Sequence, residues 1–156
     1  MKFWLKWVAG LALSLFAVSF LCLPYGFGSP KRKISRCLSN VKQQAVGILI
    51  YEGDFDDRYP RGDRWMDATK EYLKAEDARH CPLVPKGSYG YAFNSSLSLA
   101  KTPKDPEKVS IVYDSSNPIR NASDPVTSLP NPGRHDGKDH IAYADGHAKA
   151  VKVGKP

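Results

Sequence analysis

Histidine and aspartate residues gather near the C-terminus in a pattern that could support chemistry. The group comprises His135, Asp136, Asp139, His140, Asp145 and His147. Histidine and carboxylate side chains can bind zinc or transfer protons in general acid–base catalysis. However, the sequence contains no HExxH or CxxC spacing and no GxSxG nucleophile motif. The residue types alone thus allow a secreted metal-dependent enzyme or a solute-binding module, which we keep as the alternative to a non-enzymatic structural role.

The same segment has the pattern of a β-hairpin. The dipeptide Asp145-Gly146 lies between two β-capable stretches, and Asp-Gly fits a two-residue type I′ turn, in which both central residues need φ > 0. Two cross-strand pairs follow from that turn: Tyr143 with Ala148, and Ile141 with Ala150. Because side chains alternate along a strand, these four should share one apolar face.

The turn alone is a sufficient reason for Asp145 and Gly146 in this segment. We expect His135 to hydrogen-bond a backbone group near the hairpin. In the expected register His140 and His147 share a face but lie well apart, so a metal would also need His135 to fold back. The sequence therefore predicts no catalytic residue, no metal site and no cofactor.

An amphipathic helix is expected to pack on the apolar face of the hairpin. Between Ile34 and Tyr51, apolar residues recur at the three-and-four spacing of one helical face. They are Ile34, Cys37, Leu38, Val41, Ala45, Ile48 and Leu49. The run EGDFDDRYPRGD follows, and its Gly, Asp and Pro residues should end the helix after Tyr51. One long helix on a small sheet would bury both apolar surfaces in an α+β fold.

Three aspartates after this helix, Asp54, Asp56 and Asp57, raise the question of calcium binding. Their spacing does not fit an EF-hand loop, because Arg58 stands where another oxygen ligand is required. We expect these aspartates to form a turn.

The N-terminal residues differ in character from the rest of the chain. No charged residue occurs from Trp7 to Leu23, a run at the short end of what spans a bilayer. Lys2 and Lys6 precede it, as in the first region of a secretory signal. Residues 1–30 are therefore expected to be either an uncleaved membrane anchor or a cleaved signal segment, and residues 31–156 a globular domain.

The net charge of +7 is unevenly distributed, because every acidic residue lies at Glu52 or later. All charged residues from Lys31 to Lys42 are basic. A basic segment beside a membrane favours anionic lipid headgroups. The same feature could bind nucleic acid, but the segment is short and no recognition motif surrounds it. We expect a membrane as a partner, and neither nucleic acid nor a small-molecule substrate.

Several segments, in order, resemble the bacterial type II secretion pseudopilin-like family whose members end in an H-x9-DG signature. They are CLSNVKQQAVGILIYEGDFDDRYP (37–60), RWMDATKEYLKAEDARHCP (64–82), GSYGYAFNSSL (87–97) and IVYDSS (111–116). The signature itself is His135, Asp145, Gly146 and His147. The resemblance implies a pilin-like α+β fold, with a long N-terminal helix packed on a small antiparallel sheet that ends in the Asp-Gly hairpin.

The resemblance also implies a non-enzymatic, structural role in the bacterial cell envelope, accessory to type II secretion or a pilus. The domain would lie outside the cytoplasm, anchored in the inner membrane or secreted after cleavage, with other envelope, secretion or pilus proteins as partners. The N-terminus departs from the family pattern, since it lacks the Phe-Thr-Leu-Ile-Glu run of prepilins and any glutamate in its apolar stretch. We therefore expect that the chain does not polymerise by itself.

Two of the three cysteines lie in the part expected to be exported. Cys22 falls in the apolar run, which leaves Cys37 and Cys81. Two cysteines in an exported domain suggest one disulfide, and the family resemblance favours this bridge. The alternative is a pair of reduced thiols, with Cys37 as an ordinary core residue.

Overall fold

The computed structural model of the protein describes residues 29–153. The expected membrane anchor or signal segment, residues 1–30, lies outside the described residues except for its last two positions. Within the described range, no helix combines the length and the apolar character needed to cross a membrane.

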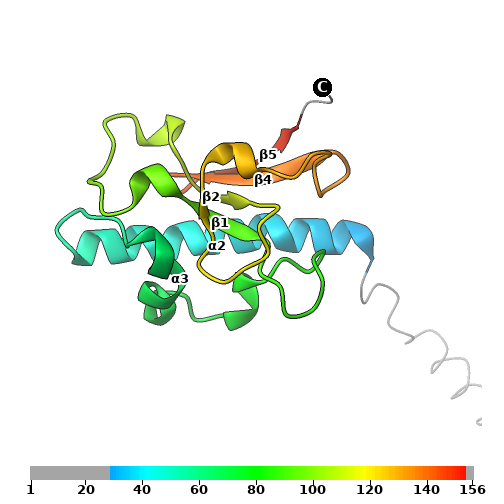
Figure 1. Ribbon diagram of the computed structural model, residues 1–156, viewed down its shortest axis with the longest axis horizontal. Helices are drawn as coiled ribbons and strands as arrows, with labels where there is room; N and C mark the ends of the chain where they lie inside the picture. Colours follow the sequence, from blue (N-terminus) through cyan, green and yellow to red (C-terminus); the bar gives the residue numbers. More distant parts are fainter. Residues whose placement is uncertain (1–28, 154–156) are drawn as a thin grey trace, which may run out of the picture.

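One long helix, α2 (Pro30–Asp54), runs along one face of the sheet (Figure 1). The Ser29 hydroxyl accepts a hydrogen bond from the backbone N–H of Arg32, and Pro30 occupies the first helical position. Both features stabilise a helix start. The helix therefore begins at Pro30, ahead of the expected Ile34, and it continues beyond Tyr51 to Asp54.

The buried face of α2 is wider than its apolar residues predict. Four of these residues are fully buried: Cys37, Val41, Ala45 and Ile48. Two polar side chains, Asn40 and Gln44, are buried beside them. The Asn40 amide donates to the His80 carbonyl at 3.0 Å, and the Gln44 amide donates to the Ala78 carbonyl at 2.9 Å. The segment around residues 76–82 thus covers a second side of α2. The side-chain amides of the helix satisfy backbone carbonyls of that segment.

The sheet has five strands in the spatial order β3-β1-β2-β4-β5. The strands are β1 (Tyr91–Asn94), β2 (Ser110–Asp114), β3 (Ser123–Asp124), β4 (Lys138–Tyr143) and β5 (Ala148–Lys152). Three neighbouring pairs are antiparallel, but β1 and β3 are parallel. The expectation of a pilin-like fold with a small antiparallel sheet is therefore wrong. Residues 29–153 form a mixed five-stranded sheet with one long helix, because the chain after β2 returns through a loop and places β3 beside β1 in the same direction.

The β4–β5 hairpin has a longer loop than expected. The Tyr143 N–H donates to the His147 carbonyl at 2.9 Å, so three residues, 144–146, form the loop. Gly146 has φ +86°, whereas Asp145 is not among the residues with positive φ. A type I′ turn would require positive φ at both positions. The prediction for Gly146 is confirmed, and the two-residue turn is wrong.

The additional loop residue shifts the strand register by one position. Ala142 pairs with Ala148, in place of the expected pair of Tyr143 with Ala148. A shift of one residue exchanges the two faces of a strand. Ala142 and Ala148 accordingly belong to the core under α2, whereas Ile141 and Tyr143 belong to a second core on the other face of the sheet.

Short helices connect the main elements. The α-helical turn α3 (Trp65–Ala68) follows the first of six 3₁₀ helices. Those six are Gly62–Arg64, Lys70–Tyr72, Glu76–Arg79, Ser95–Leu97, Pro106–Lys108 and Val126–Ser128. The indole N–H of Trp65 donates to the Ala122 carbonyl at 2.9 Å, which fixes α3 to the segment before β3.

The aspartates after α2 divide between helix and turn. Asp54 is the last residue of α2, while Asp56 and Asp57 both have φ 56° in the following turn. Aspartate tolerates this left-handed conformation better than most residues. The prediction of a turn is therefore confirmed for Asp56 and Asp57, and Asp54 belongs to the helix.

Candidate functional site

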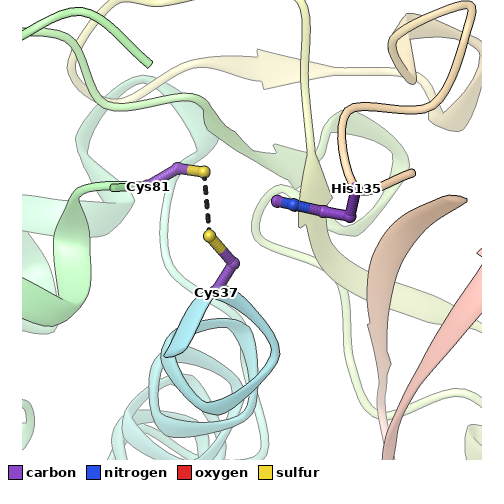
Figure 2. Close-up of side chains that lie close together, drawn as sticks. All are labelled: Cys37, Cys81 and His135. Carbon is purple, nitrogen blue, oxygen red and sulfur yellow. Dashed lines mark hydrogen bonds between the residues drawn. The ribbon is translucent and has the colours of Figure 1, made fainter. Parts of the chain in front are cut away.

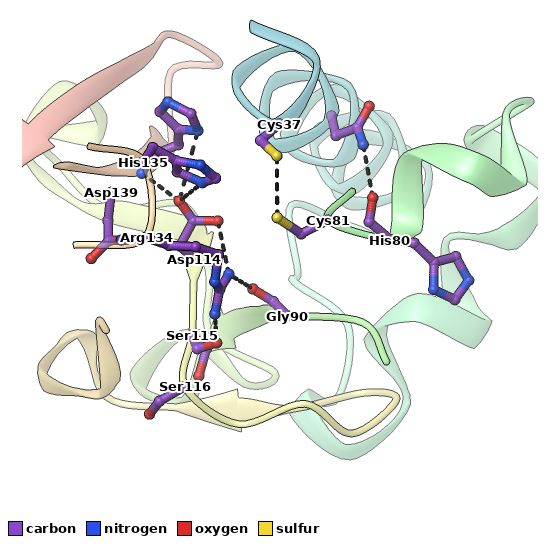
Figure 3. A network of polar contacts seen from close by, with 12 residues as sticks. Cys37, His80, Cys81, Gly90, Asp114, Ser115, Ser116, Arg134, His135 and Asp139 are labelled. Atoms are coloured by element: carbon purple, nitrogen blue, oxygen red, sulfur yellow. Dashed lines mark hydrogen bonds and ion pairs between the residues drawn. The ribbon is translucent and has the colours of Figure 1, made fainter. Parts of the chain in front are cut away.

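Asp114, the last residue of β2, is the central residue of a buried polar cluster (Figure 3). Its side chain is fully buried. Oδ2 accepts a hydrogen bond from the backbone N–H of His140 at 2.6 Å and lies 2.8 Å from Nε2 of His135. Oδ1 lies 3.3 Å from Nη1 of Arg134. One carboxylate therefore joins the end of β2 to β4 and to the loop that precedes β4.

Arg134 extends the cluster to the backbone of neighbouring segments. Its guanidinium donates to the Gly90 carbonyl at 2.9 Å and to the Ser115 carbonyl at 2.5 Å. Its backbone N–H donates to Oδ1 of Asp139 at 2.8 Å. Because the planar guanidinium holds several donors in a fixed geometry, it can connect these groups at once. The charge of Arg134 also offsets the buried negative charge of Asp114.

The two buried histidines have opposite protonation preferences. The rings of His135 and His140 stack with centroids 4.1 Å apart. Burial acts to lower the pKa of His135, but contacts with Asp114 and Cys81 outweigh it and raise the pKa to about 9. Burial, together with the charge of His135, lowers the pKa of His140 to about 4. At neutral pH the pair therefore consists of a charged His135 and a neutral His140.

Asp139, the second residue of β4, completes the polar layer. Burial raises the pKa of its carboxyl to about 6, while the hydrogen bond from Arg134 opposes that shift. Oδ2 of Asp139 is a buried oxygen with no hydrogen-bond partner. A buried carboxylate that keeps one oxygen unpaired is costly, so a proton on this group stabilises it as the pH falls.

The two cysteines lie beside His135. Cys37 of α2 and Cys81 are both buried, and their Sγ atoms are 3.1 Å apart. The hydrogen bond between them lowers the pKa of Cys81 and raises that of Cys37, and the nearby His135 lowers the pKa of Cys81 further. The structure holds both as thiols. It thus brings the expected pair together, and the disulfide itself stays a prediction.

The remaining signature residues lie elsewhere. Asp145, Gly146 and His147 are at the tip of the β4–β5 hairpin, where Nδ1 of His147 lies 2.6 Å from Oδ1 of Asp145. Hydrogen bonds from His147, first from its backbone N–H, lower the pKa of Asp145. The His147 ring stacks on Tyr143 with centroids 4.3 Å apart. The signature is thus divided between the buried cluster and an exposed turn.

The structure also corrects the expected role of His135. Its ring contacts the Asp114 carboxylate, whereas a hydrogen bond to a backbone group was expected. Its backbone N–H donates to the Lys138 carbonyl at 2.8 Å. Sequence reasoning did not identify Asp114 or Arg134 as members of the site. The available signal was the aspartate that ends the otherwise apolar run IVYD, since a charge in a buried strand requires a partner.

Chemically, the cluster combines two thiols, two imidazoles, two carboxylates and a guanidinium within the interior. Such a set can hold protons, form a disulfide or bind a metal ion. Searches against protein-family models, curated proteins and solved structures found no match for this sequence. Function must therefore follow from the geometry of the residues that the structure describes.

Proposed function

We propose that the protein is a non-enzymatic structural component of the bacterial cell envelope, with a role like that of pseudopilin-like accessory proteins of type II secretion or pili. The observation that best supports a structural role is the burial of Asp114, His135 and His140, which are at most 2% exposed. Side chains enclosed in this way hold elements together and present almost no surface to a substrate in solution.

The contacts of the cluster support the same role. Asp114 comes from β2, His140 from β4, and the Arg134 guanidinium reaches the backbone next to β1 and β2. Charged groups that pair and hydrogen-bond in the interior are costly to separate once they are formed. This arrangement favours a rigid domain, which is what a component of an assembly requires.

The start of α2 supports a position near a membrane. Lys31, Lys33 and Arg36 are exposed there, and Arg36 pairs with Asp77 at 3.1 Å. They follow the uncharged run from Trp7 to Leu23 in the sequence. An apolar segment followed by basic residues suits attachment to a surface of anionic lipids. A location of the folded domain outside the cytoplasm rests on the resemblance to envelope proteins and not on this charge pattern.

One surface of α2 supports contacts with other envelope proteins. Val46, Ile50 and Phe55 are 43%, 47% and 49% exposed, respectively. Val46 and Ile50 lie one turn apart near the C-terminal end of α2, and Phe55 directly follows the last helical residue, Asp54. Two exposed apolar side chains one turn apart give α2 an apolar surface of the kind that binds other proteins.

The alternative, a metal-dependent enzyme or solute-binding module built on the C-terminal His/Asp cluster, has less support. The exposed His147 and Asp145 lie at the hairpin tip, whereas the buried His140 lies within β4 and His135 precedes this strand. His135 and His140 line one surface pocket of about 320 Å³, but His147 and Asp145 do not line it, so the full cluster does not converge on one cavity.

Chemical footprinting tests the enclosed character of the cluster. Diethyl pyrocarbonate modifies accessible imidazoles, so the folded full-length protein should be modified at His147, whose side chain is 42% exposed. His135 and His140 should react at least about tenfold more slowly, and at the rate of His147 once urea unfolds the chain. Equal modification of His135 and His147 in the folded protein would show that solutes reach the cluster, and would favour the alternative.

Fractionation of bacterial cells tests the location. Protein expressed from the full-length sequence should appear in the membrane fraction if residues 1–30 are retained, and in the membrane or periplasmic fraction if they are cleaved. Leu15→Lys places a charge in the apolar run, at a cost of about 2.5–3.5 kcal/mol for membrane insertion, and should shift the protein to the cytosol. Leu15→Ile is the matched control and should behave as the native chain. Native protein in the cytosolic fraction would contradict an envelope role.

A further inference from the structure

We propose that Cys37, Cys81 and His135 form a binding site for Zn²⁺ when the two thiols are reduced (Figure 2). One ligand atom from each residue lies within 4.8 Å of the other two, and all three residues are buried. Cys37 comes from α2, Cys81 follows the 3₁₀ helix Glu76–Arg79, and His135 precedes β4. A bound ion would therefore connect three separate parts of the fold.

The donor set is one that zinc accepts. Two thiolates and one imidazole are zinc ligands in proteins, and soft sulfur donors select thiophilic ions over magnesium or calcium. With Zn–S bonds of about 2.3 Å, tetrahedral geometry places two sulfur atoms about 3.8 Å apart. The Sγ atoms of Cys37 and Cys81 are 3.1 Å apart. A small rotation of the two side chains would open the pair enough to admit the ion.

His135 has buried ring nitrogens that could coordinate an ion. Nδ1 and Nε2 of His135 are buried and have no hydrogen-bond partner of good geometry, although Nε2 lies 2.8 Å from Oδ2 of Asp114. Buried polar atoms without partners are rare in folded proteins, because they lose hydration without replacement. Coordination of one ring nitrogen would remove this cost. The neighbouring Asp114 carboxylate would orient the ring, as carboxylates commonly do for metal-bound histidines.

A second trio of possible ligands, Asp114, His135 and His140, is less suitable. The carboxylate of Asp114 already accepts a hydrogen bond from the backbone of His140 and pairs with Arg134. A metal bound there would lie beside the positive charge of Arg134. We therefore assign Asp114 the role of positioning His135, and we assign the metal-binding role to His135 together with the two thiols.

Surface pockets bring solvent close to the site. One pocket of about 510 Å³ is lined in part by Cys81 and His80, and another of about 320 Å³ is lined in part by His135 and His140. Either offers an entry path for an ion. On binding, the protons still held by the two thiols and by His135 pass to solvent, and the two thiolates neutralise the charge of the ion.

Cys37 and Cys81 cannot bind zinc as thiolates while they form a disulfide. The experiment therefore starts from full-length protein treated with a phosphine reductant and a chelator. Equilibrium dialysis against Zn²⁺, followed by elemental analysis, should give one tightly bound ion per chain. Cys37→Ser, Cys81→Ser and His135→Gln should each weaken binding at least about tenfold. Cys22→Ser and His147→Gln are the matched controls and should bind as the native chain does.

Cobalt provides a measurement that needs no variant. Co²⁺ bound to thiolates gives an intense sulfur-to-metal charge-transfer absorption, and titration of the reduced native protein should produce this band and saturate at one equivalent. Zinc should then displace the cobalt and remove the band. A folded, reduced chain that shows no charge-transfer band and retains no zinc after dialysis would overturn the proposal. Zinc binding that survives in His135→Gln and in both cysteine variants would overturn it equally.

Discussion

Two histidine–aspartate pairs in this protein have the same chemistry and opposite surroundings. His135 and Asp114 are 2.8 Å apart, and neither side chain is exposed. His147 and Asp145 are 2.6 Å apart, with side-chain exposures of 42% and 33%. Both histidines belong to the same C-terminal segment. The difference shows that burial, which depends on packing against distant segments, decides whether such a pair stabilises the fold.

The magnitudes expected for the two pairs differ accordingly. An exposed ion pair typically contributes about 0–1 kcal/mol, because water and salt screen its charges. Removing one partner of a buried pair costs about 3–5 kcal/mol, because the other charge remains in the interior without compensation. Substitutions in the two regions can therefore test whether the comparison is correct.

The largest effect is expected for Asp114→Ala. This change removes the acceptor of the His140 backbone N–H and leaves Arg134 and His135 without their buried carboxylate. The free energy of unfolding should fall by about 3–5 kcal/mol in urea titrations. The matched change Asp145→Ala should lower it far less, because water and salt screen an exposed pair. Similar losses in the two variants would contradict the comparison.

A smaller effect is expected when an arginine is replaced by lysine. Arg134 is 15% exposed in its side chain and connects two backbone carbonyls with Asp114. Lysine cannot reproduce this fork of donors, so Arg134→Lys should cost about 2–3 kcal/mol. Arg120 is 35% exposed and pairs with Asp67. Arg120→Lys should cost less than about 1 kcal/mol. Thermal unfolding of both variants provides the measurement, and equal shifts would not fit a special role for Arg134.

The hairpin turn should show an intermediate effect that does not depend on charge. Gly146 has φ +86°, and an added Cβ would lie 3.3 Å from Cδ1 of Leu49. Gly146→Val should therefore lower the free energy of unfolding by about 1–2 kcal/mol or more. Gly137 has φ +77° with no atom within 4 Å of an added Cβ, so Gly137→Ala reports the backbone cost alone. A melting temperature unchanged by Gly146→Val would show that the loop tolerates a side chain there.

The smallest effect is expected for His147→Ala at the hairpin tip. The pair with Asp145 should contribute a small stabilisation at low salt, and this contribution should vanish in molar salt because exposed charges are screened. Hydrogen bonds from His147 lower the pKa of Asp145, so the contribution is present above the unfolded pKa of an aspartate and is lost as the pH falls through the folded value. A difference between native and variant protein that persists at high salt would point to stacking on Tyr143 instead.

The sequence reveals the main elements better than their mutual arrangement. The periodic apolar residues of α2 and the Asp-Gly dipeptide of the hairpin are local signals, and both elements are present. The hairpin register could not be read, because Asp-Gly fits both two-residue and three-residue loops. The parallel strand β3 has only two residues, too few for any alternation of polar and apolar side chains to appear.

Among the candidate site residues, too, the sequence reveals those with a local signal and not those that depend on distant partners. Cys37, Cys81 and His135 attract attention by residue type alone, and the structure brings them together. Asp114 and Arg134 carry the most connected contacts of the cluster, yet each depends on partners twenty or more positions away in the chain. No local pattern encodes such partners. A charge at the end of an apolar strand can indicate that a partner exists, but not which residue it is.

The capped start of α2 has a mechanical consequence. Ser29 has the non-helical φ −58° and ψ 144°, and its carbonyl accepts the first helical hydrogen bond, from the Lys33 N–H at 3.2 Å. A load applied to the chain ahead of Ser29 would first pull on a rod about 37 Å long, given the 1.5 Å rise per residue and the 25 residues of α2. Cys37 lies about two turns into that rod. A covalent or metal link from Cys37 to Cys81 would transfer the load to the rest of the domain near the tether, and would protect the remainder of α2 from being peeled off the sheet.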